Sequence, residues 1–152
     1  MKWHAVLAWC AGIAIFCVDR LSKWAATQHF FDRFGWPPYL QFELVYNRGV
    51  SWGLLHSHET WVFSAVTLVI AGVLVWLMRY TYERLMTGKP IIAEACVLAG
   101  ALSNMCDRIM YGGVIDFIAL SYGAWHFPVF NAADVAISLG VCALFIQHYS
   151  EE

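Results

Sequence analysis

Residues 60–78 run for 19 positions without a single charged side chain. As an α-helix this segment would be about 28 Å long, which is close to the thickness of the hydrocarbon core of a bilayer. Three more apolar segments lie at residues 3–22, 90–108 and 131–148. Backbone polar groups in lipid need internal hydrogen-bond partners, so each segment is predicted to be a helix. The sequence therefore predicts a mainly α-helical membrane protein with four transmembrane helices, forming one domain over residues 1–152.

The composition supports lipid as the solvent of this chain. Hydrophobic residues make up 61% and charged residues 13%, whereas soluble domains are about half apolar and a quarter charged. A net charge of −2 offers no basic surface for nucleic acid. The first apolar segment resembles a secretory signal peptide, but no small-residue cleavage site precedes Asp19, so a retained first helix is the preferred interpretation.

The orientation of the spans follows from where the basic residues are dense. With four spans, one side carries four basic residues and the other carries five, so the count alone decides nothing; they are Lys2, Arg79, Arg84 and Lys89 against Arg20, Lys23, Arg33, Arg48 and Arg108. Three of the first group lie within residues 79–89, interpreted as a short loop, where the positive-inside rule is strongest. Both termini are therefore predicted to be cytoplasmic, with residues 27–59 and 109–130 on the outer face.

These two outer segments have the patterns of β-strands. In residues 39–46, Leu40, Phe42, Leu44 and Tyr46 alternate with polar positions, which predicts a strand with those four side chains on one face. Residues 114–118 follow two glycines and are also β-prone. We expect a small sheet on the outer membrane surface, with aromatic side chains at headgroup depth, namely Trp36, Trp52, Trp61, Tyr122 and Trp125.

Metal and disulfide chemistry have little support. The five cysteines are odd in number, widely spaced and without a C-x-x-C pair, so no disulfide or zinc framework is predicted. His56 and His58 have no further ligand nearby, and no metal or cofactor is expected there.

Polar residues at the ends of the spans are the informative ones, because a polar group in lipid is costly unless it is paired. They gather on the predicted outer face and share helix faces by their spacing; they are Asp19 with Lys23, Asn104 with Asp107 and Arg108, Asn131 with Asp134, and Asp116 between the last two spans. Each has a plain structural explanation. Charged pairs can mark helix ends, Asn131 can be an N-cap, and Asp134 can be favoured by the helix dipole. Glu94, further along its span, is expected to be interfacial or paired.

Taken together, these polar residues indicate a catalytic site. Asp116 and Asp134 come from different segments that a short connection brings to one membrane face. Two carboxylates sharing a site cannot both ionise cheaply, which gives an acid beside a base. Such a pair can activate water for attack on an amide.

At these residues the chain resembles lipoprotein signal peptidase (signal peptidase II), a family of bacterial intramembrane aspartic peptidases. Five segments match the family motifs in order: residues 19–23 (DRLSK), 47–53 (NRGVSWG), 100–108 (GALSNMCDR), 113–117 (GVIDF) and 127–134 (FPVFNAAD). Two positions depart from the pattern, Ser103 in place of glycine and Ala119 in place of an acid. Ser103 is expected to alter helix packing near Asn104.

The resemblance implies an aspartic endopeptidase with Asp116 and Asp134 as the catalytic pair. It implies supporting roles for Asn104, Arg108, Asn131, Asn47, Gly49, Asp19 and Lys23. The implied substrate is a prolipoprotein whose cysteine carries diacylglycerol, cleaved just before that cysteine at the outer face of the bacterial cytoplasmic membrane. Membrane lipid is the other implied partner, and a monomer suffices because one chain contains the site.

Two other classes of function remain open on the residues alone. A small ion- or proton-coupled transport component could use Asp19, Lys23, Asp116 and Asp134 as a path, but a path needs ionisable groups at several depths. A non-catalytic membrane scaffold would leave the polar cluster without a role. Ion flux would favour the transporter, and peptide cleavage would exclude the scaffold.

Overall fold

A computed structural model describes residues 3–33, 36–49 and 59–151. The helices are α1 (Trp3–Thr27), α2 (Thr60–Met86), α3 (Ile92–Tyr111) and α4 (Ala132–Glu151), with a short 3₁₀ helix η1 (Phe31–Arg33). The strands are β1 (Leu40–Asn47), β2 (Val114–Tyr122) and β3 (Trp125–His126). Trp52, His56 and His58, and residues 50–53 of the second motif, lie outside the described residues.

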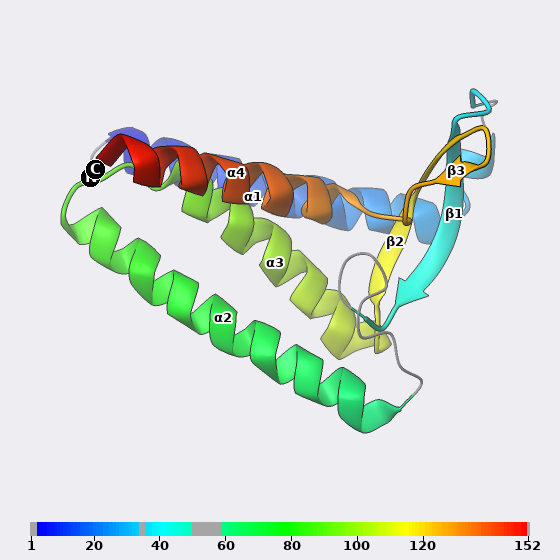
Figure 1. Ribbon diagram of the computed structural model, residues 1–152, viewed down its shortest axis with the longest axis horizontal. Helices are drawn as coiled ribbons and strands as arrows, with labels where there is room; N and C mark the ends of the chain where they lie inside the picture. Colours follow the sequence, from blue (N-terminus) through cyan, green and yellow to red (C-terminus); the bar gives the residue numbers. More distant parts are fainter. Residues whose placement is uncertain (1–2, 34–35, 50–58, 152) are drawn as a thin grey trace.

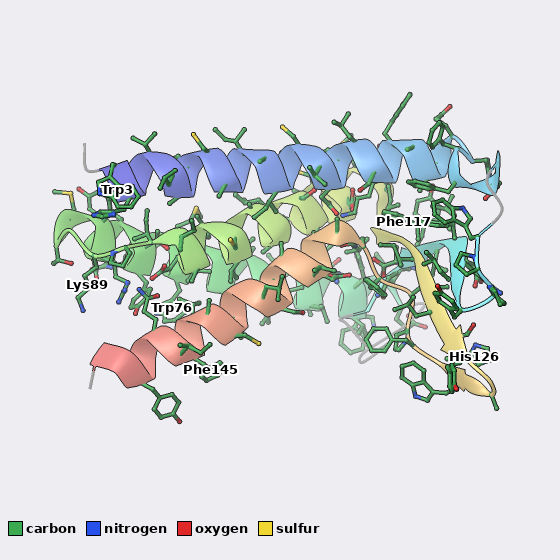
Figure 2. All side chains as sticks on the ribbon, turned by 90° about the horizontal axis from the view of Figure 1, so that it is seen from above. Trp3, Trp76, Lys89, Phe117, His126 and Phe145 are labelled. Atoms are coloured by element: carbon green, nitrogen blue, oxygen red, sulfur yellow. The ribbon has the colours of Figure 1, made fainter. Side chains whose placement is uncertain are left out.

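The described chain is mainly helical with the small sheet at one end. Figure 1 shows α3 running beside α1 and α4, while α2 leaves this group toward the sheet end. Figure 2 places Trp3 and Lys89 at one end of the helices and Phe117 and His126 at the other. The polar loop between α2 and α3 thus lies opposite the sheet.

Two helices of the described residues, α1 and α2, are long and apolar enough to cross a membrane. Few residues of their most apolar stretches are buried inside the protein. Large polar side chains are buried beside apolar ones, because the largest fully buried side chains, apart from that of Ile115, are those of Lys23, Glu94, Asn131, Asp19, Asp107 and Ser103. Apolar side chains outside and polar ones inside are the pattern expected when the solvent is lipid.

Small residues let α3 and α4 approach closely. A Cβ at Gly100 would stand 2.7 Å from the carbonyl oxygen of Ala133, and one at Gly140 would stand 2.9 Å from that of Ala93. Both contacts are shorter than packed side chains allow, so the helix pair depends on these two glycines.

The expectation of a short loop at residues 79–89 was wrong over most of that segment. Residues 79–86 continue α2, and the exposed Arg79–Glu83 pair spans one turn of that helix. Pro90 precedes α3, which begins at Ile92. The expectation for Glu94 is confirmed in its paired form, since its carboxylate lies 2.7 Å from buried Arg84.

The three strands form an antiparallel sheet in the order β1-β2-β3. Both predicted strands are confirmed, whereas the two-residue β3 was not predicted; Gly123, with φ +59°, makes the tight turn into it. The aromatic rings of Phe31 and Phe42 stack 4.4 Å apart, and Phe31 also stacks on buried Phe117 at 5.6 Å. These contacts pack η1, which follows α1, against the sheet.

A β-bulge corrects the predicted face of β1. The register with β2 shifts between Phe42 and Val45, so the alternation reverses after that point. Tyr46 is therefore 48% exposed and does not share the face of Phe42. The same shift turns Asn47 inward, toward β2.

Candidate active site

A cavity of about 660 Å³ opens between α2, α3, α4 and the sheet. Most of its wall is apolar and includes Ile70, Val73, Val97, Ala101, Ile137 and Leu139. Its polar lining consists of Asn47, Asn104, Arg108, Asp116, Asp134 and Ser138, together with Gly49. An amphipathic ligand could place its apolar part against the helices and its polar part at the aspartates.

Asp116 enters the cavity from β2. Its Oδ2 accepts a hydrogen bond from Asn47 Nδ2 at 3.0 Å, and its Oδ1 accepts one from Asn131 Nδ2 at 2.6 Å. Asn47 reaches it across the β1–β2 ladder because of the bulge described above. Asp116 is 2% exposed, so both carboxyl oxygens are held by the protein.

Asp134 enters from the first turn of α4. Its Oδ1 accepts from Asn104 Nδ2 at 3.0 Å, and its Oδ2 accepts from the backbone N–H of Asn131 at 3.2 Å. The backbone N–H of Asp134 donates in turn to Asn131 Oδ1 at 2.9 Å. The N-cap interpretation of Asn131 is thus confirmed, and the same residue links the two aspartates.

The direction of each asparagine amide is set by an obligate donor. Asn47 Oδ1 accepts the N–H of Gly49 at 2.9 Å, and Asn131 Oδ1 accepts the N–H of Asp134. A backbone N–H can only donate, so the amide oxygen must face it and the NH₂ group must face the aspartate. Both aspartates are therefore surrounded by donors.

The charge of Asp116 is disfavoured by its surroundings. Burial raises the pKa of this carboxyl from its ordinary 3.8 to about 7, and the charge of Asp134 acts in the same direction. Hydrogen bonds from Asn47 and Asn131 and the charge of Lys23 partly oppose the rise in pKa. A carboxyl with this pKa carries its proton for much of the time near neutral pH, as a general acid must.

Behind the aspartates lies a buried charge cluster. Lys23 is fully buried, and its Nζ lies 2.7 Å from Asp19 Oδ2 and 2.7 Å from Asp107 Oδ2. Asp19 Oδ1 also accepts the backbone N–H of Ala133 at 2.7 Å, while Arg20 pairs with the other oxygen of Asp107. The cluster therefore fastens α1 to α3 and to the start of α4.

Arg108 and Gly49 meet at the edge of the cavity. Arg108 Nη2 donates to the carbonyl oxygen of Gly49. Arg108 is 5% exposed, and its Nη1 has no hydrogen-bond acceptor among the described residues. Arg108 lines the cavity and interacts electrostatically with both aspartates.

The structure brings together all nine residues expected at the site. It adds two partners that the sequence reasoning did not include among them, Asp107 and Ser103. Ser103 Oγ donates to Asp19 Oδ2 at 2.6 Å, so the departure from glycine supplies a buried hydrogen bond. The spacing of Asp107 from Asn104 predicted that both lie on one helix face. The same pattern is also typical of a charged residue at a helix end, so it did not identify Asp107 as part of the site.

This fold is similar to those of known bacterial membrane enzymes. One solved structure described in these words aligns with a TM-score of 0.70 and 26% identity, covering 95% of this chain and 88% of that chain. A second aligns with a TM-score of 0.61 and 24% identity, covering 93% and 91%. This chain thus has the fold of these bacterial membrane enzymes.

A sequence profile of the family described as signal peptidase (SPase) II matches residues 11–150, so the chain belongs to the signal peptidase II family and is a peptidase. The lipoprotein signal peptidase of Actinobacillus succinogenes is 35% identical over 146 residues, covering 93% of this chain and 88% of the relative. Those of Polynucleobacter necessarius and Listeria monocytogenes serotype 4a are 34% and 30% identical, covering 95% and 92% of this chain and 90% and 91% of the relatives.

Proposed function

We propose that this chain is an aspartic endopeptidase that removes signal peptides from diacylglyceryl-modified prolipoproteins. Cleavage falls just before the lipidated cysteine. The observation that carries this proposal is the pair Asp116 and Asp134 at the polar end of an apolar cavity, each carboxyl held by amide donors. Family membership supports lipoproteins as the substrate class.

The pair acts by general acid–base catalysis on a water molecule. One carboxylate takes a proton from water as its oxygen attacks the carbonyl carbon of the scissile peptide bond. The other carboxyl gives its proton to the leaving nitrogen as the C–N bond breaks. The products are a free carboxyl group on the signal peptide and a free amine on the lipidated cysteine, and no covalent enzyme intermediate forms.

The cavity suits both halves of such a substrate. The diacylglyceryl chains lie against Ile70 and Val73 of α2 and the facing side chains of α4. Arg108 Nη1 donates to a carbonyl oxygen of the substrate, because a buried guanidinium N–H without an acceptor costs free energy until a ligand supplies one.

In the membrane, we infer four spans with both termini cytoplasmic in the bacterial inner membrane. Lys89 lies at the end opposite the sheet (Figure 2), and Arg79 and Arg84 lie in the C-terminal part of α2, which leads to that end. This placement agrees with the positive-inside rule. The aspartates then lie toward the outer face, and the chain forms one membrane domain that acts as a monomer with lipid around it.

Purified variants acting on a lipidated lipobox peptide test the proposal. Asp116→Asn and Asp134→Asn should each abolish cleavage while remaining folded, whereas the matched variant Asp32→Asn, at a 56% exposed carboxylate, should cleave normally. The unlipidated peptide should be a poor substrate, and strong chelators should leave activity unchanged. Full activity of either Asn variant at the pair would exclude the catalytic pair, and a loss restored by zinc would indicate a metallopeptidase. Ion flux through proteoliposomes without cleavage would instead favour a transport component.

A further inference from the structure

Lys23 has no unused hydrogen-bonding capacity. Its ammonium group carries three N–H donors, and three acceptors lie 2.7 Å from it, namely Asp19 Oδ2, Asp107 Oδ2 and Asn104 Oδ1. The first two neutralise its charge within the cluster. The third reaches out of the cluster to a residue that contacts the catalytic pair.

This third contact sets the direction of the Asn104 amide. An ammonium group cannot accept a hydrogen bond, so Asn104 must turn its Oδ1 toward Lys23. Its Nδ2 is then forced to face Asp134 Oδ1, where the distance is 3.0 Å. Asn104 Oδ1 also accepts a hydrogen bond from Asn131 Nδ2 at 3.2 Å. This bond supports the orientation in which the Asn131 NH₂ group faces the site.

The two aspartates differ in how their surroundings treat a negative charge. Asp134 lies in the first turn of the 20-residue helix α4, where the unpaired N–H groups of the helix favour an anion. Asp116 lies in a strand and has no helix terminus of its own. Each carboxylate accepts two hydrogen bonds, and at Asp134 one of them comes from Asn104, whose donation favours the charged form that the helix terminus also favours.

Few other charges face the pair. Lys23 and Asp19 come from α1, and Arg108 comes from α3. The cavity lining contributed by β1 is neutral Asn47, with Gly49 just after the strand, and that contributed by α2 is apolar Ile70 and Val73. Arg108 and the charge of Lys23 act on both aspartates, whereas the Asn104 Nδ2 donor held by Lys23 bonds directly to Asp134.

We propose that Lys23 is a positioning residue that, through the Asn104 amide, keeps Asp134 ionised as the general base and leaves the shared proton on Asp116 as the general acid. This inference rests on the proposed function of the pair. Lys23 is fully buried and its three donors are taken up by protein acceptors, so it acts on the pair through its charge and by holding the Asn104 amide in one of its two orientations.

The test compares Lys23→Met and Lys23→Arg by the pH dependence of kcat and KM with the lipidated peptide. Without the ammonium group the Asn104 amide can turn over and present its oxygen to Asp134, which then holds the proton. For Lys23→Met we expect kcat to fall about 100-fold with KM within about twofold. Because a positive charge is lost near both carboxyls, the pH profile should move to higher pH by about one unit. Lys23→Arg keeps the charge and the donors and should restore most of kcat and the original profile.

Two further variants distinguish a positioning role of Lys23 from an effect of the substitution on folding. Lys23→Met with Asp107→Asn keeps the net charge of the Asp19–Arg20–Lys23–Asp107 cluster at zero, and it should fold if the single variant does not. Arg84→Met removes one partner of the buried pair with Glu94 at the opposite end; it should lower thermal stability without moving the pH profile.

The experiments distinguish a failure of the positioning role of Lys23 from a failure of the proposed catalytic pair. If the Asn variants at positions 116 and 134 are inactive but the folded Lys23 variants keep the wild-type pH profile, the positioning role is wrong and the catalytic pair stands. A profile that moves equally in Arg84→Met would also overturn the positioning role, because it would then follow stability.

Discussion

Asn131 and Asp134 hold each other by two reciprocal hydrogen bonds. The N–H of Asp134 donates to Asn131 Oδ1 at 2.9 Å, and the N–H of Asn131 donates to Asp134 Oδ2 at 3.2 Å. This is a capping box, which begins α4 and orients a carboxylate at once. The remaining Nδ2 of Asn131 reaches Asp116 Oδ1 at 2.6 Å, so one helix cap joins both aspartates.

Substitutions at Asn131 should distinguish its role as the N-cap of α4 from its role as a hydrogen-bond donor to Asp116. Asn131→Asp keeps an N-cap oxygen but offers no N–H to Asp116, so we expect a folded protein with at least about 100-fold lower activity. Asn131→Ala loses both functions and should also lose about 1 kcal/mol of stability. Thermal unfolding and peptide cleavage in detergent measure the two effects, and an active Asn131→Asp variant would contradict the role of the Nδ2 donor.

Activity should fall as the pH rises through about 7. The catalytic pair needs one proton, and the carboxyl of Asp116 loses its proton with a pKa of about 7. The alkaline limb of the kcat/KM profile should therefore have an apparent pKa near this value, which belongs to the pair as a whole. A profile that stays flat from pH 6 to pH 9 would be inconsistent with this acid.

Stability should also decrease with rising pH, in a way that depends on Asp116. Its pKa is raised on folding from 3.8 to about 7, so between these values the folded protein binds more protons than the unfolded one. The free energy of unfolding should then fall by up to about 4 kcal/mol between pH 4 and pH 7. Asp116→Asn should reduce this slope in thermal unfolding scans, and an unchanged slope would assign it to other groups.

The two glycines Gly100 and Gly72 form a matched pair for helix packing. A Cβ at Gly100 would meet Ala133 O at 2.7 Å and Ile137 Cγ1 at 2.9 Å, whereas one at Gly72 would meet nothing within 4 Å. Gly100→Ala should destabilise the protein by about 1–3 kcal/mol, and Gly72→Ala should be neutral or stabilise it by up to about 1 kcal/mol. Equal effects on the unfolding temperature would exclude close α3–α4 packing at Gly100.

The buried and the exposed ion pair formed by arginines of α2 should contribute differently to the free energy of unfolding. Arg84→Met leaves the fully buried Glu94 without its 2.7 Å partner and should cost about 3–5 kcal/mol. Arg79→Met breaks an exposed pair with Glu83 and should cost at most about 0.5 kcal/mol. Chemical denaturation at equal pH compares them, and a small effect of Arg84→Met would show that Glu94 finds other partners.

Local patterns in the sequence were sufficient to predict the four long helices and the strands β1 and β2, but not η1 or the two-residue β3. The helices and two strands were predicted because apolar runs and alternation repeat with the periods of the backbone itself. The element ends were less certain, as α2 shows by continuing to Met86. Its last turns are polar, and hydropathy alone assigned them to a loop.

The sequence by itself determined that this chain lies in lipid, which residues are polar enough to form a site, and which family it resembles. Only the tertiary structure decided how those residues meet. The bulge that turns Asn47 toward Asp116 and the Lys23–Asn104 contact join residues 69 and 81 positions apart. Such contacts depend on strand register and helix crossing. The direction of a hydrogen bond also depends on whether its partner can donate or accept. The periodic pattern of a sequence does not contain that information, because the partner lies far away in the chain.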